Sequence, residues 1–442
     1  MSSSHITDAL VTTGELSELF ADTSAIQAML DVEVALARAE STLGIVPRPA
    51  AMAITKAAIA TEFDAAALAR EARDAGTIAI PLVKALTERV RAIDPAAAGF
   101  VHWGATSQDI VDTALVILID RAVDLIGRDH AGLATSLRAL SDRHKDDVMI
   151  GRTVLQPAAP TTFGLKVAGW YAAVQRGWAR VDTRRREAVV LQFGGAAGTL
   201  AALEANGAQV AERLGRELGI RCPAAPWHAY HDNLAALVAA CGIYTGSLAK
   251  VARDVSLLMQ FEVGEAREEG GGSSAMPQKQ NPTGCAVTLA AAARLPGLTA
   301  AAIASLVQEH ERSVGGWLTA WPTMADALQA TGAAAAAMRG VASGLIVDPA
   351  RMRANLDATN GAVYAERATM LAARTLGRDT AHRLVKEALR SGQAGQRLSA
   401  IVRATPALAD AISVADLETL DDPAAYLGVA ETLRQRLLTG SH

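Results

Sequence analysis

The stretch GGGSSAMPQKQNP, residues 270–282, separates two long segments that are rich in Ala and Leu and have the composition of helices. It contains three glycines, two serines, a lysine and an asparagine. Glycine permits backbone conformations and close approaches that other residues do not. The stretch is therefore either a flexible connector or a polar loop that takes part in a reaction.

The composition indicates an α-helical protein with a large buried core. Of the 442 residues, 50% are hydrophobic but only 4% are aromatic, and Ala and Leu dominate where β-branched and aromatic residues would indicate sheet. The net charge of -4 is small, and no run of Lys and Arg resembles a surface for nucleic acid or membrane. An anionic ligand must therefore be met by local positive charge.

The cysteines and the N-terminus favour a soluble cytoplasmic protein. Three cysteines, widely spaced, form no CxxC or Cys/His metal pattern: Cys222, Cys241 and Cys285. The first ten residues, MSSSHITDAL, lack the basic start and apolar core of a signal peptide. The most apolar long stretch, 285–307, contains Arg294 and Pro296, which suits a packed bundle helix better than a membrane span.

Apolar residues at helical spacing predict a series of helices. The expected segments are 23–43, 64–93, 109–144, 165–190, 232–268 and 283–308, the last with a kink at Pro296. Helices of about 30 residues are roughly 45 Å long, which is too long for an ordinary compact domain. We therefore expect an elongated bundle whose apolar faces are partly buried by neighbouring chains.

The breaks between these segments predict three domains. An N-terminal helical domain occupies residues 1–101, and a central bundle of long helices with the Gly-rich loop occupies 102–347. A small helical domain with shorter pieces occupies 348–442.

Three polar loops concentrate hydrogen-bonding side chains. They hold, in chain order, His102, Thr106, Ser107, Gln108 and Asp109; Arg152, Thr153 and Gln156; and Ser273, Ser274, Lys279, Gln280 and Asn281. These neutral and cationic donors suit several carboxylates and offer little that would bind a metal. An anionic small molecule is the natural ligand.

Simpler interpretations exist for several of these residues. Thr106 and Ser107, ahead of Asp109, can have the simple role of capping a helix. His102 can be a structural histidine. His228 and His231 have the i,i+3 spacing of a metal pair on a helix, but no nearby carboxylate pair or cysteine supports one. The GGAAGT segment at 194–199 lacks the strand and helix of a dinucleotide site, which favours a turn.

The loop sequence resembles a known family signature. In GSSAMPQKQN, residues 272–281, a Gly-Ser pair is followed by Met, Lys and Asn at the spacing that is typical of the fumarase/aspartase superfamily. HWGATSQDIVDTA, residues 102–114, resembles the first shared region of that superfamily, and GRTVLQPAAPTTFG, residues 151–164, resembles the second. The resemblance runs in order from about residue 20 to residue 370.

The resemblance implies a fold and a set of roles. Members of the fumarase/aspartase superfamily are all-α, three-domain homotetramers with a twenty-helix core, and three subunits build each active site. It implies that Ser273 transfers a proton at carbon and that Lys279 supports it, with no metal and no cofactor. It also implies a substrate-binding set: His102, Thr106, Ser107, Gln108, Arg152, Thr153, Gln156, Ser274, Met276, Asn281 and Arg312.

Position 154 indicates the type of reaction. In that superfamily, most members that expel an amine or hydroxide have a Thr-His-x-Gln pattern, whereas this chain has Thr153, Val154, Leu155 and Gln156. Valine cannot move a proton, but a carboxylate leaving group, with a pKa near 4, needs none. Read in reverse, such a step is a lactonisation, in which a carboxylate oxygen adds to a double bond and the adjacent carbon takes a proton.

Several further segments resemble the bacterial 3-carboxy-cis,cis-muconate cycloisomerases. They are LQFGGAAGTL at 191–200, PWH at 226–228, SLVQEHERSVGGW at 305–317 and NLDAT at 355–359. The expected ligand is a small tricarboxylate. A fumarate-releasing lyase of the argininosuccinate or adenylosuccinate type is the alternative, since Gln278 also resembles argininosuccinate lyases. A non-catalytic protein that keeps the fold is a third interpretation.

Overall fold

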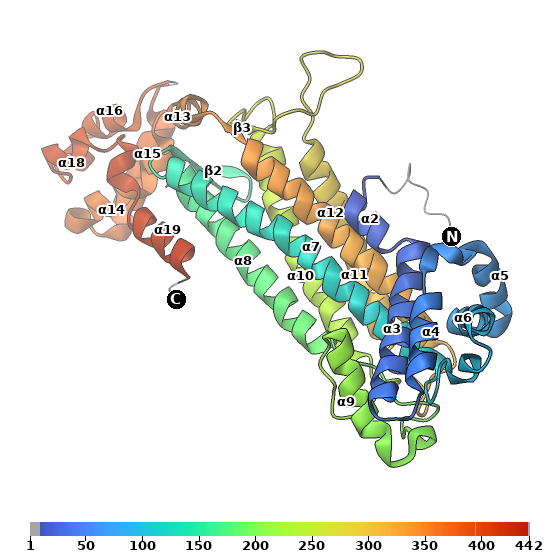
Figure 1. Cartoon of the computed structure of the whole chain (residues 1–442). Helices are drawn as coiled ribbons and strands as arrows, with labels where there is room; N and C mark the ends of the chain where they lie inside the picture. The colour runs from blue at the N-terminus through green and yellow to red at the C-terminus, as the bar shows by residue number, and fades with distance from the viewer. Residues whose placement is uncertain (1–8, 394, 441–442) are drawn as a thin grey trace. The chain divides into compact units, whose positions relative to one another are not determined.

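The computed structural model describes residues 9–393 and 395–440, and these residues are mostly helical (Figure 1). They form two compact units. The first holds residues up to Ala131 together with Arg176–Ala249 and Val287–Ala337, and the second holds Gly132–Gln175, Lys250–Ala286 and the residues from Met338 onward. Residues 1–8, for which the sequence predicts no signal peptide, lie outside the described residues.

Five long helices, of 22 to 37 residues, have residues in both units: α7 Ser107–Arg143, α8 Phe163–Ala188, α10 Asp232–Leu258, α11 Thr283–Ala304 and α12 Ala320–Gly344. Apolar stripes of helical period account for them, and α11 continues through Pro296. The all-α expectation is confirmed. The expected division at 101/102 and 347/348 stays a prediction.

The first unit also contains further helices, of which α3 is the longest. They are α2 Gly14–Leu19, α3 Asp22–Thr42, α4 Arg48–Ala57, η1 Ala60–Glu62, α5 Ala65–Ala75, α6 Ala79–Ile93, η2 Ala97–Phe100, η3 Ala201–Asn206, α9 Gly207–Leu218 and η4 Gly316–Thr319. The core of this unit packs α3, α4 and α6 against the first half of α7 and against α9. Leu30, Leu36, Leu82 and Leu86 are fully buried within it.

The second unit contains the strands and the C-terminal helices. They are β1 Val148–Thr153, β2 Gln156–Thr162, β3 Ala266–Arg267, β4 Ile346–Val347, α13 Pro349–Asp357, η5 Ala362–Tyr364, α14 Ala365–Leu376, α15 Arg378–Ser391, α16 Leu398–Arg403, α17 Pro406–Ala409, α18 Val414–Glu418, η6 Pro423–Tyr426 and α19 Ala430–Thr439. A separate core, from Tyr364 to Leu420, holds the C-terminal helices together. β1 and β2 form an antiparallel hairpin from Val148↔Thr162 to Thr153↔Gln156, with an irregularity between Ile150 and Arg152.

Three expectations about the elements were wrong. The segment 64–93 is two helices, because Gly76 takes a left-handed φ of 71° and ends α5. The segment 232–268 is helical only to Leu258, after which a turn and β3 follow. The break at 151–164 is mostly the β1–β2 hairpin, because residues on both sides of its tip pair with one another.

Two helices, α10 and α11, are long and apolar enough to cross a membrane by length and composition alone. In the apolar window of α10, 56% of the residues are buried, and in that of α11 only 22% are buried. Core helices of water-soluble proteins meet the same criteria, so this is weak evidence for a span.

Gly164 provides a test of the packing between the end of α7 and the start of α8. A Cβ there would lie 2.6 Å from Lys145 Cα and 2.7 Å from the Ser141 carbonyl oxygen. Since these are backbone atoms, we expect Gly164→Ala to lower the free energy of unfolding by about 1–3 kcal/mol. Urea denaturation monitored by circular dichroism measures it.

Gly169, in the same helix, is the matched control. A Cβ at Gly169 meets nothing within 4 Å. Gly169→Ala should stabilise the protein by up to about 1 kcal/mol, and equal effects at the two positions would contradict the packing described.

Candidate functional site

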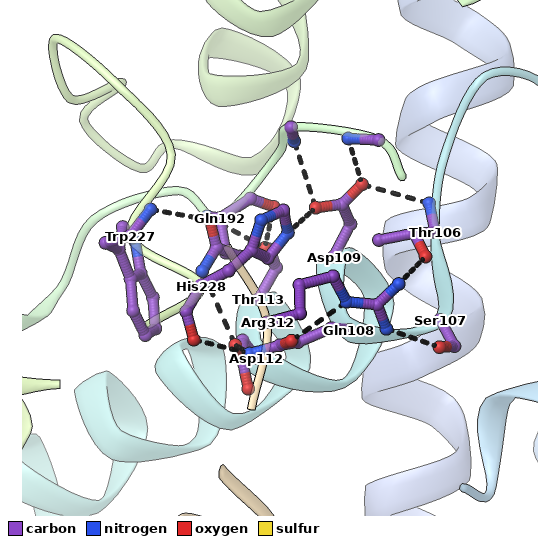
Figure 2. A network of polar contacts seen from close by, with 12 residues as sticks. Thr106, Ser107, Gln108, Asp109, Asp112, Thr113, Gln192, Trp227, His228 and Arg312 are labelled. Atoms are coloured by element: carbon purple, nitrogen blue, oxygen red, sulfur yellow. Dashed lines mark hydrogen bonds and ion pairs between the residues drawn. The ribbon is translucent and has the colours of Figure 1, made fainter. Parts of the chain in front are cut away.

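The carboxylate of Asp109 joins three segments of the first unit (Figure 2). Its Oδ1 accepts hydrogen bonds from Gly194 N at 2.9 Å and lies 2.7 Å from His228 Nε2. Its Oδ2 accepts from Thr106 N at 3.0 Å and from Gly195 N at 2.9 Å. With a side chain only 1% exposed, Asp109 fixes the first polar loop against the loop that begins at 191 and against the segment around His228.

The start of α7 explains how Thr106 and Ser107 are used. α7 begins at Ser107, and the Asp109 carboxylate reaches back to Thr106 N, as the third residue of a capping box does. The hydroxyls of Thr106 and Ser107 instead accept hydrogen bonds from Arg312. Asp109 thus caps the helix, and both hydroxyls face a cation.

Arg312 binds three consecutive residues of the first polar loop (Figure 2). Its Nη1 donates to Thr106 Oγ1 at 2.7 Å, its Nη2 to Ser107 Oγ at 3.2 Å, and its Nε to Gln108 Oε1 at 3.2 Å. The structure therefore brings together four of the predicted substrate-binding residues. One guanidinium surrounded by hydroxyl and amide groups is suited to a carboxylate.

The buried side-chain amides of Gln108 and Gln192 stabilise the loop that contacts Arg312. Gln108 Nε2 donates to Asp112 Oδ2 at 3.0 Å and to the His228 carbonyl oxygen at 2.8 Å. Gln192 Oε1 accepts from Trp227 N at 2.9 Å (Figure 2). Because these amide groups are buried and hydrogen-bonded, they hold the loop in one arrangement.

His102 precedes this cluster and has a carboxylate partner. Its Nδ1 lies 2.6 Å from Glu33 Oε1 on α3. Burial by itself lowers the pKa of His102, but the charge of Glu33, the hydrogen bond to it and the charge of Asp109 outweigh burial and raise that pKa.

The second polar loop is the tip of the β1–β2 hairpin in the second unit. Thr153 and Gln156 are its last pair, and the tip residues Val154 and Leu155 have positive φ values of 50° and 64°. Their side chains are 95% and 75% exposed. A β-branched residue in this conformation is strained, and such strain concentrates at functional sites.

Arg152, at the base of this tip, is bonded to a buried acid. Its Nη1 and Nη2 donate to the Glu265 carboxylate at 2.8 and 2.6 Å, and Asn355 Nδ2 donates to the same carboxylate at 2.8 Å. Glu265 is fully buried. These contacts fix the hairpin to the segment before the Gly-rich loop, and the expected contact of Arg152 with substrate stays a prediction.

The Gly-rich loop presents Ser273 with two backbone donors. Ala275 N and Met276 N donate to Ser273 Oγ at 3.3 and 3.2 Å. Ser274, Met276 and Lys279 are exposed, and among the described residues Lys279 Nζ has no hydrogen bond or ion pair. The loop thus combines a supported hydroxyl with a free cation.

The base of this loop is closed by Asn281 and Gly271. Asn281 N donates to the Gly271 carbonyl oxygen at 2.6 Å, and Asn281 Nδ2 donates to the Gly272 carbonyl oxygen at 3.3 Å. A Cβ on Gly271 would lie 2.0 Å from the Asn281 carbonyl oxygen, so only glycine fits. Beyond the base, Glu268 accepts from Gly284 N and Cys285 N at the start of α11, each at 2.9 Å.

His228 and His231 are buried in the first unit, and each lies near an aspartate. His228 pairs with Asp109, and His231 Nε2 lies 3.8 Å from Asp112 Oδ2. Across residues 9–393 and 395–440, no three His, Cys, Asp or Glu side chains form a group that could hold a metal ion.

The sequence did not single out several of these partners. Glu33 and Glu265 bind predicted site residues, and for His228 the sequence offers the spacing of a metal pair and a family resemblance but not its partner Asp109. Glu33 carried a usable signal, because a charged residue stands on the apolar face of the first long predicted helix. His228 carried none, since its partner lies 119 residues away.

Asp109→Asn provides a test of the Asp109 cluster. An amide offers one acceptor oxygen and turns an N–H2 group toward buried N–H donors, so at least one of them loses its acceptor. We expect the free energy of unfolding to fall by about 3 kcal/mol, and hydrogen exchange at the Gly194 and Gly195 amides to accelerate. Urea denaturation and exchange mass spectrometry measure the two effects.

Asp120→Asn, on the same helix, is the control. Asp120 is 42% exposed and pairs with Arg185 at 2.6 Å, so its loss should cost about 1 kcal/mol or less. Unchanged exchange at Gly194 and Gly195 in the Asp109 variant would contradict the role of Asp109.

Comparisons with known proteins identify the family. Residues 9–297 match the family model described as Lyase, and residues 361–437 match the model described as Adenylosuccinate lyase C-terminus. The 3-carboxy-cis,cis-muconate cycloisomerase of Bradyrhizobium diazoefficiens is 44% identical over 422 residues, 94% of each chain. The nitrosuccinate lyase of Streptomyces davaonensis is 39% identical over 437 residues, 95% of this chain and 91% of that one.

A solved structure of one such cycloisomerase has the same fold as this chain. The crystal structure of the 3-carboxy-cis,cis-muconate lactonizing enzyme from Pseudomonas putida superposes with a TM-score of 0.93 at 42% identity, and the match covers 98% of each chain. This chain therefore belongs to the 3-carboxy-cis,cis-muconate cycloisomerase family of enzymes, within the lyase family that the sequence signature indicates.

Proposed function

We propose that this chain converts 3-carboxy-cis,cis-muconate to 4-carboxymuconolactone, the cycloisomerase step of the β-ketoadipate route of protocatechuate breakdown. A carboxylate oxygen of the substrate adds to a double bond, and the adjacent carbon, next to a second carboxylate, takes a proton from Ser273. The observation that carries the proposal is the pair of backbone N–H groups on Ser273 Oγ.

Those two donors address the weakness of serine as an acid or base. A serine hydroxyl has a high pKa and needs help to reach the alkoxide form. N–H groups at Ser273 Oγ stabilise negative charge on that oxygen as the proton leaves. In the reverse direction the same alkoxide removes the proton from carbon.

Positive groups support the recognition of a tricarboxylate. Arg312, with Thr106, Ser107 and Gln108, offers a preorganised place for one carboxylate. Lys279 and Asn281, in the Gly-rich loop, are assigned to the charge that develops beside Ser273. Because nucleophile and alkene lie in one molecule, holding the reactive conformer supplies much of the acceleration.

Val154 favours a leaving group that needs no proton. Valine stands at the exposed tip of the hairpin, where an acid or base would be required to protonate an amine or hydroxide. Carboxylate meets this condition, and so does nitrite. A nitrosuccinate lyase activity is therefore the second candidate, ahead of the argininosuccinate and adenylosuccinate types.

The active enzyme is assigned as a homotetramer with shared active sites. The Val154 and Leu155 side chains are 95% and 75% exposed in the single chain, and only 22% of the apolar window of α11 is buried. Apolar surface of this kind is covered by other chains in stable oligomers.

The three cysteines are free thiols, which supports a reducing cytoplasmic location. We assign no metal or cofactor to the reaction.

Ser273→Ala should abolish turnover. The purified protein should consume 3-carboxy-cis,cis-muconate, followed by its ultraviolet absorbance, with EDTA present. Removing the proton donor should lower kcat by at least about 100-fold, while size-exclusion chromatography shows the oligomer unchanged.

Ser343→Ala is the control and should leave kcat unchanged. Ser343 is exposed on α12, and its hydroxyl donates to the Gly340 carbonyl oxygen. Release of fumarate from nitrosuccinate, without consumption of the muconate, would replace the cycloisomerase with the second candidate. Retained turnover in the Ser273 variant would overturn the role of Ser273.

A further inference from the structure

A buried acid, Glu33, contacts the ring of His102 in the first unit. Glu33, on α3, has a side chain that is 1% exposed, and its Oε1 lies 2.6 Å from His102 Nδ1. The His102 side chain is 20% exposed. Within the described ranges, His102 Nε2 has no hydrogen-bond partner. One ring nitrogen is therefore anchored inward, and the other is left for a ligand.

The backbone at His102 is held in an unusual conformation. Its φ of 60° lies in the left-handed region that non-glycine residues rarely adopt. Such a conformation persists only where the surrounding structure fixes it. Two residues on, Gly104 has a φ of 68° and packs against Leu203, and the Asp109 cluster then holds Thr106. The ring is thus placed at a fixed position ahead of the residues that bind Arg312.

The charges around this pair favour a positive imidazole ring. Burial lowers the pKa of His102, but Glu33 and Asp109 outweigh burial and raise it. The nearby cation, Arg312, is bound to the adjoining loop residues. On the same helix as Glu33, Glu40 is fully buried, and neither carboxylate oxygen has a partner. Burial, and then the charge of Glu33, raise the pKa of Glu40 to about 8. Glu40 is therefore mostly neutral at pH 7, and among the two acids on this face of α3 it is Glu33 that contacts His102.

We propose that Glu33 is a positioning residue for the cycloisomerase reaction. By binding Nδ1, it fixes the orientation and positive charge of His102, so that Nε2–H donates to a carboxylate of the tricarboxylate substrate. A second-layer carboxylate on a histidine sets which nitrogen carries the proton and which way the ring faces. This inference rests on the proposed function, and it assigns the partner that the sequence left open for His102.

Glu33→Gln tests the proposal, because it keeps the shape of the side chain and removes its charge. KM for 3-carboxy-cis,cis-muconate should rise roughly tenfold, as expected for the loss of a charged hydrogen bond, with a smaller change in kcat. The pKa of His102, measured by NMR titration of the ring, should fall. As pH rises, the imidazolium is then lost sooner, so the high-pH limb of kcat/KM should move to lower pH.

Two further variants separate positioning from packing. Glu33→Asp keeps the charge and should restore part of the change in KM. Glu40→Gln replaces a neutral acid on the same buried face by a neutral amide, and it should leave KM and the pH profile unchanged. An unchanged His102 pKa and pH profile in Glu33→Gln, with only a lower unfolding temperature, would overturn the proposal.

The NMR titration also separates this inference from the assigned activity. If the unmodified protein does not convert the muconate, the proposed function fails. The titration still reads the coupling of His102 to Glu33, and a pKa that does not fall in Glu33→Gln contradicts the inference by itself.

Discussion

The first polar loop depends on the buried carboxylate of Asp109. Four donors from three segments converge on its two oxygens: the Thr106, Gly194 and Gly195 backbone N–H groups and the His228 ring. A buried carboxylate is costly unless it is fully bonded, so each of these segments has to keep its place. The result is a rigid frame on which Thr106, Ser107 and Gln108 present their side chains to Arg312.

The two units contribute different chemistry. The first holds a guanidinium and an imidazole, each fixed by partners, which suits the recognition of carboxylates. The second holds Ser273 with its two N–H donors and the strained hairpin tip at Val154 and Leu155. Valine at the tip is consistent with an enzyme that moves one proton, at carbon, and leaves the departing group unprotonated. Membership of the cycloisomerase family fits this division, and the similarity to a nitrosuccinate lyase fits it as well.

The sequence predicted the long helices well, because an apolar stripe of helical period is a local property. It failed at Gly76 and after Leu258, where single residues and short turns end helices that the composition would continue. It also missed the hairpin, because Thr153-Val154-Leu155-Gln156 contains none of the Asn-Gly or Asp-Gly turn residues that mark one.

For the site, the sequence supplied the motif residues but not their partners. The loop signature predicts Ser273, Lys279 and Asn281 as site residues, and this stays a prediction, whereas Glu33 lies 69 residues from His102 and Glu265 lies 113 residues from Arg152. Pairings at such separations follow from tertiary packing and leave no local pattern. An acid on an apolar helix face, as at Glu33, is the kind of sign that sequence reasoning can use.

The most direct measurement is the NMR spectrum of the product formed from 3-carboxy-cis,cis-muconate in D2O. Proton transfer by a single fixed residue predicts one deuterium, on one face of the carbon next to the carboxylate, in 4-carboxymuconolactone. It also predicts that Ser273→Ala forms none of this product. Deuterium on both faces, or release of fumarate in place of the lactone, would contradict a cycloisomerase in which Ser273 delivers the proton.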